Sequence, residues 1–335
     1  MHAARRPHPS RLFPAIVAIM PIMAALAAWL LLVCQPAWAG PGKGFLWTVE
    51  GKRPVYLLGS IHLAEPGLYP LDEAVERAFA ASDVLVVEAD VTGPAEARAA
   101  RLFVERGTLP AGEDLASSLS PATLERLKAR SVDLGLYGSM RPWALALVLQ
   151  SVELDRLGYD PALGVDRHFL LRARERGLAV EELEGLEAQY ALFADMDPVM
   201  EEDFLAQTLD ELDASAALAR EIVSAWRRGD TRALERAIFA GLEEDPRAAP
   251  VHERIFFARN RAMAAKIKAY LEKGRAAFVV LGAGHLVGER GVVALLCEMG
   301  YTVRGTEDRR RAGGQEPVRP PAGMPAQDAA YGANP

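Results

Sequence analysis

The sequence predicts an α/β fold: a mixed, mainly parallel sheet built from both ends of the mature chain, with a large helical insert between them. The first observation is a repeated tetrapeptide, Gly59-Ser60-Ile61-His62 and, near the other end, Gly282-Ala283-Gly284-His285. The second is that each copy ends an apolar run, at residues 55–58 and 277–281, which is typical of a buried parallel strand. Both histidines are therefore expected in turns at the carboxyl ends of strands, where open α/β sheets bind ligands.

Residues 1–39 have the pattern of an export signal. A start with three arginines leads into an apolar stretch at residues 12–33, and Ala37-Trp38-Ala39 fits a small-x-small cleavage site. An uncleaved membrane anchor is the alternative, because the apolar stretch is long for a signal core, although Pro14 and Pro21 interrupt it. We expect an exported protein, periplasmic or extracytoplasmic, that touches a membrane only through this segment if the segment is uncleaved.

The charge balance argues against nucleic acid as a partner. The formal net charge is −7, and loss of residues 1–39 removes three arginines and no acid, which gives −10. A chain this acidic does not suit nucleic acid or an anionic membrane surface. Of the two cysteines only Cys297 lies outside residues 1–39, so a disulfide framework is excluded and the core must supply the stability.

The first elements of the domain predict a hairpin followed by a parallel unit. They are a strand, a turn, a second strand, a helix and a third strand, at residues 45–50, 51–52, 53–61, 70–81 and 83–88. Strand, helix and strand in so short a span predict a right-handed parallel βαβ unit. Glu88 closes its second strand as His62 closes its first, so we expect both side chains to face one crevice.

The middle of the chain is predicted to be helical apart from one short strand. Helical spacing is found at residues 95–106, 121–131, 142–157, 164–176 and 197–273. The short strand, at residues 178–184, puts Glu184 at a further strand end. A last strand, helix and strand follow at residues 276–281, 291–299 and 300–303. We therefore expect one α/β domain at residues 44–305 with a helical insert at about 94–273, and a tail at 306–335 that lacks apolar periodicity and should be disordered.

Imidazoles and a carboxylate at strand ends suggest a metal site. His62, His285 and Glu88 are ligand types that suit a divalent transition metal, and Zn, Mn, Co and Fe are all compatible. Three or fewer protein ligands would leave a position for water, which the metal makes acidic enough to act as a nucleophile near neutral pH. Glu184, as a carboxylate that does not bind the metal, is the candidate to take the proton. The alternative is that each histidine is a hydrogen-bonded turn residue.

Other catalytic signatures are weak in this sequence. It contains no H-E-x-x-H, no G-x-S-x-G and no Walker A motif. Ser60 is a poor candidate nucleophile, because neighbours two apart on an extended segment lack hydrogen-bond geometry with His62. The second tetrapeptide with Gly288 imitates a dinucleotide-binding loop with altered spacing. His168 and His252 are expected to be structural or exposed.

Seven separated motifs resemble the TraB/GumN family, also called TraB/PrgY/Tiki, over about residues 44–305. They are Leu57-Leu58-Gly59-Ser60-Ile61-His62, Val86-Val87-Glu88, Arg141-Pro142-Trp143, Gly164-Val165-Asp166, Leu183-Glu184 with Gln189, Arg259-Asn260 and Gly282-Ala283-Gly284-His285-Leu286. The resemblance implies a fold related to erythromycin esterase-like and ChaN-like proteins and a metal-dependent, peptidase-like hydrolase. Tiki members act as metalloproteases on Wnt proteins, and TraB/PrgY members limit peptide pheromone signalling, so a peptide or protein substrate is implied.

The resemblance also implies roles for individual residues. By position, His62, His285 and Glu88 become the metal ligands, with Glu88 also catalytic. Arg259 and Asn260 become polar groups of the active site that hold a substrate carbonyl or a developing oxyanion.

Two further residues are implied to bind substrate or to support the metal ligands, Arg141 and Asp166. For these two and for Arg259, a buried structural ion pair is the alternative. At the level of function the alternative is a non-catalytic protein of the same fold that binds a peptide, haem or a metal.

Overall fold

The computed structural model describes residues 45–62, 64, 67–244 and 248–305. The predicted export signal at 1–39 and the predicted disordered tail at 306–335 lie outside the described residues. Within the described ranges, none of the helices combines the length and the apolar character that a bilayer-spanning segment needs.

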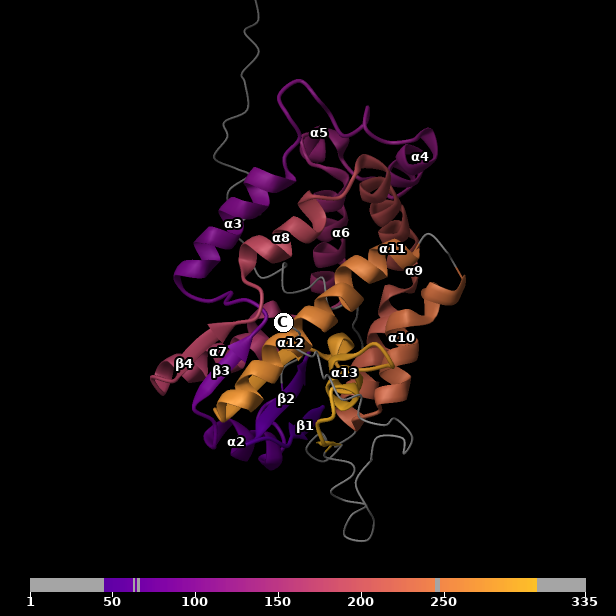
Figure 1. Ribbon diagram of the computed structural model, residues 1–335. Coiled ribbons are helices and arrows are strands. Elements are labelled where there is room, and N and C mark those ends of the chain that lie inside the picture. The colour runs from indigo at the N-terminus through magenta and orange to yellow at the C-terminus, as the bar shows by residue number, and fades with distance from the viewer. Residues whose placement is uncertain (1–44, 63, 65–66, 245–247, 306–335) are drawn as a thin grey trace, which may run out of the picture.

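The fold is α/β with a mixed sheet, as the sequence predicted (Figure 1). The six strands lie in the order β4-β3-β5-β2-β1-β6. Four neighbouring strands are parallel: β4 (Ala179–Glu182), β3 (Val84–Val87), β5 (Ala277–Gly282) and β2 (Val55–Ser60). The strands β1 (Leu46–Val49) and β6 (Val303–Gly305) complete the sheet; β6 lies at its edge, and β1 is antiparallel to both of its neighbours, β2 and β6. The sheet is therefore built from both ends of the domain.

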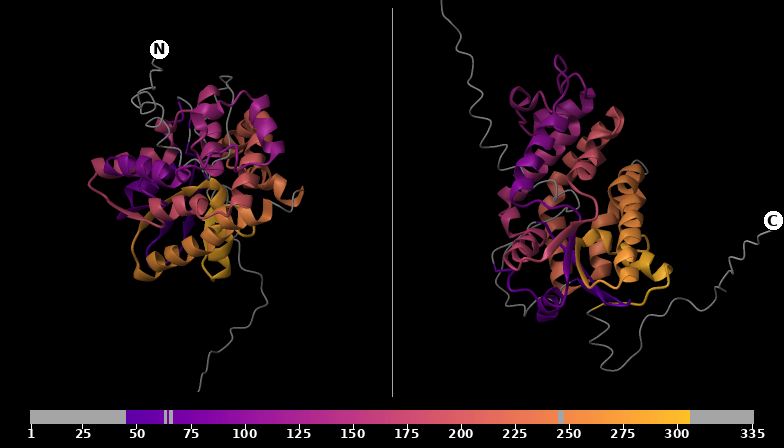
Figure 2. Two further views of the ribbon diagram at one scale, coloured as in Figure 1. Left: turned by 90° about the horizontal axis from the view of Figure 1, so that it is seen from above. Right: turned by 60° about the vertical axis from the view of Figure 1, so that its left-hand side comes forward.

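Strand β5 comes from the C-terminal part of the domain. It lies between β2 and β3, which come from the N-terminal part. The register pairs Ser60 of β2 with Gly282 of β5, and Val87 of β3 with Val280 of β5. The yellow C-terminal segments accordingly lie beside the indigo N-terminal strands in every view (Figures 1 and 2). This insertion brings the carboxyl ends of three strands that are distant in sequence to one edge.

The helices occupy the positions that the periodicity predicted, with small shifts at their ends. They are α2 (Glu73–Ala80), α3 (Pro94–Gly107), α4 (Pro121–Ala129), α5 (Leu134–Tyr137), α6 (Pro142–Arg156), α7 (Val165–Glu175), α8 (Leu186–Ala194), α9 (Pro198–Arg228), α10 (Thr231–Glu244), α11 (Ala248–His252), α12 (Ala258–Lys273) and α13 (Val292–Glu298). The short α5 and the helix α8 were not predicted. The helical insert is interrupted, because α7 and β4 return to the sheet between α6 and α8 (Figure 1).

Both faces of the sheet are covered, and alternate strand residues serve the two faces. On one face Leu58 and Phe278 pack with side chains of α2, α7, α9 and α10. On the other face Leu57 and Val279 pack with side chains of α12 and α13. A separate apolar core joins α3, α6, α8 and α9 within the insert. The carboxyl edge of the sheet therefore lies between the sheet cores and the insert core.

Local sequence sets the ends of the longest helix of the insert. Asp197 accepts a hydrogen bond from the Met200 amide at the start of α9, and Pro198 occupies the first turn, where its missing N–H costs nothing. Gly229 ends the helix in the left-handed conformation with φ of 70°. Near this end Trp226 donates from its indole nitrogen to the Gly59 carbonyl at 2.8 Å. The helix end thus contacts the first tetrapeptide directly.

Replacement of Phe278 in β5 tests the packing that holds this strand between β2 and β3. Its ring is fully buried, 4.9 Å from the ring of Phe169 and 5.4 Å from that of Phe79 between centroids. Phe278→Ala should lower the free energy of unfolding by about 3–5 kcal/mol, because it removes buried contacts and leaves a cavity. Urea denaturation measures this. Val104→Ala, at an exposed position on α3, should change stability by no more than about 0.5 kcal/mol; equal effects would contradict the packing described.

A candidate active site at the carboxyl edge of the sheet

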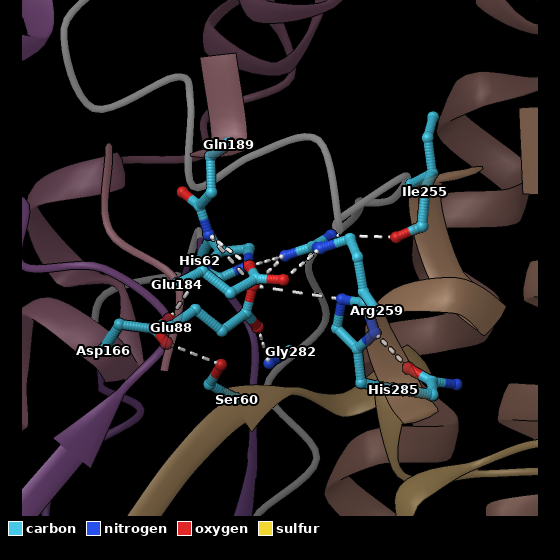
Figure 3. Close-up of polar contacts among 11 residues, drawn as sticks. Ser60, His62, Glu88, Asp166, Glu184, Gln189, Ile255, Arg259, Gly282 and His285 are labelled. Carbon is cyan, nitrogen blue, oxygen red and sulfur yellow. Dashed lines mark hydrogen bonds and ion pairs between the residues drawn. The ribbon is translucent and has the colours of Figure 1, made fainter. Parts of the chain in front are cut away.

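The four parallel strands each deliver one polar side chain to the same edge. His62 lies two residues after β2, Glu88 directly after β3, Glu184 two residues after β4, and His285 ends a short 3-10 turn, Ala283–His285, after β5. Figure 3 shows these side chains converging from different elements. His62, Glu88 and His285 are all buried. The structure therefore brings together the four strand-end residues that the sequence singled out.

His62 is held from behind by Asp166 of α7. Its Nδ1 atom lies 2.6 Å from Asp166 Oδ2, and the Ser60 hydroxyl donates to Asp166 Oδ1 at 2.8 Å. An ionised carboxylate only accepts hydrogen bonds, so His62 Nδ1 carries the proton. Among the described residues, the opposite ring atom, His62 Nε2, has no hydrogen-bond partner although it is buried. Ser60 is thus a donor to Asp166 in this arrangement.

The Gly164-Val165-Asp166 motif docks the start of α7 onto the first tetrapeptide. The Val165 amide donates to the Ile61 carbonyl at 2.9 Å. A Cβ atom on Gly164 would lie 2.3 Å from the carbonyl oxygen of His62, so this position requires a glycine for close approach of the two backbones. The three residues of the motif thus serve one purpose, which is to place the Asp166 carboxylate against His62.

The charges of His62 and Asp166 support each other. Burial by itself would lower the pKa of His62, but the negative charge of Asp166 and the hydrogen bond to it raise the pKa above its ordinary value. Burial would raise the pKa of Asp166, but His62 and the hydrogen bonds from His62 and Ser60 hold that pKa below its ordinary value. In the metal-free protein the pair therefore favours a charged imidazolium beside a carboxylate.

His285 has different neighbours. Its Nδ1 atom lies 2.6 Å from the side-chain oxygen of Asn260, and its Nε2 atom lies 3.9 Å from Glu88 Oε2. The ring is completely buried, 5.3 Å from the ring of Phe256 between centroids. Burial, followed by the positive charge of Arg259, lowers the pKa of His285 well below its ordinary value. His285 Nε2 is also buried without a hydrogen-bond partner in the part of the chain that the structure describes.

Arg259 of α12 joins the two glutamates. Its Nη2 atom donates to Glu88 Oε2 and to Glu184 Oε2, each at 2.6 Å, and its Nε atom donates to Glu184 Oε1 at 2.8 Å. Its Nη1 atom donates to the Ile255 carbonyl at 2.9 Å. A guanidinium has five N–H groups, and these contacts with described residues use four of them. Both oxygens of Glu184, the predicted proton acceptor, are thus occupied by Arg259.

Two elements around Arg259 could not be read from the sequence. The segment Glu253–Phe257 between α11 and α12 is a π-helix, a form often found at functional sites, and it supplies the Ile255 carbonyl and the Phe256 ring. Helix α8 supplies Gln189, whose Nε2 atom donates to Glu88 Oε2 at 3.2 Å and to Glu184 Oε2 at 3.4 Å. Its place in the motif after Leu183-Glu184 was the one signal pointing to it.

Arg141 lies in a different group of contacts. It forms an ion pair with the buried Glu201 of α9, with Nε 3.1 Å from Glu201 Oε1, and its Nη1 atom donates to the Arg106 carbonyl at 3.4 Å. These contacts fasten the start of α6 to α9 inside the helical insert. The other predicted residues, including Asp166, Arg259 and Asn260, contact the strand-end groups directly.

The donors at the site suit a divalent metal in part. Two buried imidazoles have Nδ1 held by an acceptor and Nε2 without a partner in the described ranges, which is the usual arrangement of metal-binding histidines. With His62 neutral, as a metal ligand must be, the formal charges of Glu88, Glu184, Asp166 and Arg259 sum to −2, which a divalent cation would balance. However, the described residues contain no group of three His, Cys, Asp or Glu side chains that could hold a metal ion. The structure thus shows two suitable nitrogen donors with Glu88 beside them, and no complete metal site.

Comparisons with known proteins place the chain in a family. Residues 45–305 match the TraB/PrgY/gumN family, and the chain belongs to it. It is 28% identical over 277 residues to an Escherichia coli protein called "Uncharacterized protein YbaP", covering 80% of this chain and 99% of that protein. It is 27% identical over 342 residues to "Metalloprotease TIKI2" of Danio rerio, covering 82% of this chain and 62% of that protein. No solved structure matches the chain.

Asp166→Asn tests the charged pair and has a defined pH dependence. In metal-free protein the substitution should lower the free energy of unfolding by about 3 kcal/mol, because it leaves His62 buried without its partner charge. Because folding raises the pKa of His62, the charged ring contributes to the free energy of unfolding. This contribution is complete below pH 6.5 and is lost as pH rises through the pKa of His62 in the folded protein. Folding lowers the pKa of Asp166, so its carboxylate also contributes to the free energy of unfolding. This contribution is present above pH 3.8 and is lost as pH falls through the pKa of Asp166 in the folded protein. Urea denaturation should therefore show the largest difference from wild type between about pH 4 and 6.5.

The control for this prediction is Asp210→Asn, which removes an equal charge from an exposed side chain. It should leave the free energy of unfolding within about 1 kcal/mol of wild type at every pH. A difference between wild type and Asp166→Asn that grows above pH 7 would contradict the assignment of charges.

Gly164→Ala tests the docking of α7. The added methyl group cannot fit beside the His62 carbonyl, so the substitution should lower the free energy of unfolding by about 1–3 kcal/mol. Gly135→Ala is the matched control, since its methyl group would meet only a side-chain oxygen of Asp133, at 3.1 Å. Thermal melts of the two variants measure the effect, and an unchanged melting temperature for Gly164→Ala would show that the two backbones are not in close contact.

Proposed function

Starting from membership of the TraB/PrgY/gumN family, we propose that the protein is a metal-dependent hydrolase with peptidase-like activity. One observation carries the proposal. Two buried imidazoles, delivered by strands from opposite ends of the domain, have their Nδ1 atoms held, and their Nε2 atoms near Glu88 have no hydrogen-bond partner among the described residues. A relative named as a metalloprotease, at 27% identity, supports the same reaction class.

The proposal gives each residue of the site a role. His62 and His285 would hold the ion, with Glu88 as the neighbouring carboxylate. Bound there, a divalent ion would polarise a carbonyl and make water more acidic near neutral pH. Contacts with the described residues leave Arg259 one N–H group on Nη1, which is suited to donate to a substrate oxygen as negative charge develops. Because Glu184 contacts Arg259 through both oxygens, we assign it the role of holding the guanidinium in place.

Substrate, location and domain layout are part of the same proposal. We propose a peptide or protein substrate and no nucleic acid partner, in keeping with the acidic chain. We propose export to the periplasm or another extracytoplasmic space, on the pattern of residues 1–39. We propose, from the resemblance stated above, that the α/β domain at 44–305 has an erythromycin esterase-like or ChaN-like core. The metal would be Mn, Co, Zn or Fe.

A second candidate function is binding of a peptide, haem or metal without turnover. The position of Arg259 favours it, because one guanidinium contacts both glutamates and leaves neither as a free proton acceptor. Removal of metal by a chelator, replacement by Mn, Co, Zn or Fe, and incubation with a peptide library read by mass spectrometry would separate the two. Cleavage that returns with one of these metals supports the hydrolase, whereas peptide or metal binding with no cleavage under any of them supports the second candidate.

Replacement of each histidine tests the ligand assignment. His62→Ala and His285→Ala should each lower the metal content of the purified protein at least about tenfold, since each removes a nitrogen donor. Elemental analysis measures this, and peptide cleavage should fall in parallel. His168→Gln is the control: this residue stacks on Tyr69 and its Nε2 atom lies 3.4 Å from Arg172 Nη1, so the variant protein should keep its metal. Unchanged metal content in both alanine variants would show that these histidines are not the ligands.

A further inference from the structure

We propose that Asn260 is a positioning residue that locks His285 in the Nδ1–H tautomer, so that the unprotonated His285 Nε2 faces Glu88 Oε2 and is available to a cation. That the cation is a metal ion rests on the proposed function; the tautomer does not. The proposal changes the role implied for Asn260, because both polar atoms of its amide have partners within the protein.

The orientation of the Asn260 amide is fixed by a backbone group. Its Nδ2 atom donates to the Arg290 carbonyl at 2.8 Å. A carbonyl oxygen can only accept a hydrogen bond, and the opposite orientation would place two oxygens against each other at that distance. The side-chain oxygen of Asn260 must therefore be the atom that faces His285. The amide is almost fully buried, so no solvent competes for either contact.

The orientation of Asn260 in turn fixes the proton on His285. Asn260 Oδ1 lies 2.6 Å from His285 Nδ1, and because this oxygen is an acceptor, Nδ1 must donate. In a neutral imidazole the other nitrogen is then an acceptor, which is here the buried and unpartnered Nε2. A chain of two hydrogen bonds thus runs from the Arg290 carbonyl to the free atom of His285.

The free atom of His285 faces a second acceptor. Glu88 Oε2 lies 3.9 Å from His285 Nε2. Glu88 itself accepts hydrogen bonds from the Gly282 amide at 2.7 Å, from Arg259 and from Gln189, the surroundings of an ionised carboxylate. Glu88 Oε2 already has donors in Arg259 and Gln189, whereas the buried His285 Nε2 has none among the described residues, which is unfavourable for an acceptor until a ligand enters. The lock therefore leaves the lone pair of His285 Nε2 available to a positive ligand beside Glu88.

Asn260 differs from Asp166 in a way that suits this role. Asp166 holds His62 with a negative charge, which also favours protonation of the ring. Asn260 holds His285 with a neutral amide, which orients the ring and adds no charge. His285 thus presents a lone pair to the ligand, and a proton is a weaker competitor for it.

The direct test is the tautomer of His285 in the metal-free protein. Long-range ¹H–¹⁵N spectra of ¹⁵N-histidine protein distinguish the two tautomers, and the absence of the signal in His285→Gln identifies it. Wild type should show Nδ1–H. Asn260→Leu, which removes both hydrogen bonds, should lose this form and bind Zn²⁺ about 10–100-fold more weakly by competition with a chelator. Wild type with Nε2–H, or Asn260→Leu with unchanged tautomer and affinity, would overturn the proposal.

Two matched variants separate the lock from a purely structural role. Asn260→Asp keeps an acceptor for His285 but cannot donate to the Arg290 carbonyl, so Nδ1–H should persist and Zn²⁺ affinity should not fall. If Asn260 only fastened the chain at Arg290, Asn260→Asp would be as damaging as Asn260→Leu, and that result would overturn the proposal. Arg290→Ala removes a side chain that pairs with Glu253 and keeps the carbonyl, so it should leave the tautomer unchanged.

The design also separates this proposal from the proposed function. If Asn260→Leu fails to fold, the spectra of wild type and Asn260→Asp still decide the tautomer. Wild type with Nδ1–H that neither binds a metal nor cleaves a peptide would refute the hydrolase and leave the lock in place. Metal-dependent cleavage by a wild-type protein with Nε2–H on His285 would support the hydrolase and refute the tautomer lock.

Discussion

The parallel pairing of β5 with β2 is the contact on which the rest of the site depends. It joins residues from the two ends of the domain, and its register sets Ser60 opposite Gly282, so that both tetrapeptides leave the sheet at the same level. The paired residues are almost all fully buried, with apolar side chains on both faces. Without this pairing His62 and His285 would belong to separate parts of the molecule. A function that needs both histidines is therefore tied to complete folding of the domain.

Burial at this edge forces every charge to find a partner. An isolated charge in such surroundings would be costly, and the structure meets this with two connected groups: Ser60, His62 and Asp166 on one side, and Glu88, Glu184, Gln189 and Arg259 on the other. What remains unpaired is informative. The imidazole Nε2 atoms of His62 and His285 have no hydrogen-bond partner among the described residues. An enclosed site with unpaired imidazole nitrogens and an excess of carboxylates over guanidinium groups is suited to a cationic ligand.

From the sequence, the residues at the strand ends could be predicted far better than the side-chain contacts that hold them in place. His62, Glu88, Glu184 and His285 could be placed because each closes an apolar run, and local pattern is enough for that. The position of β5 between β2 and β3 could not be predicted, because strand order depends on long-range packing. Helix α8 was missed because residues 186–194 are apolar at most positions and show no helical period. The contact of Asp166 with His62 depends on how α7 docks, which the spacing of the motif does not reveal.

The two tetrapeptides are alike in sequence but not in structure, and the difference explains how the site is held. His62 lies two residues beyond the paired position Ser60, whereas His285 lies three residues beyond Gly282 and at the end of a 3-10 turn. The two rings therefore need different supports. Asp166 comes from α7, which packs on one face of the sheet, and Asn260 comes from α12, which packs on the other. Each face of the sheet thus contributes one helix, and each helix orients one histidine. A shift of either helix would misplace only its own histidine, so the relative position of the two free nitrogen atoms reports the packing of both faces at once.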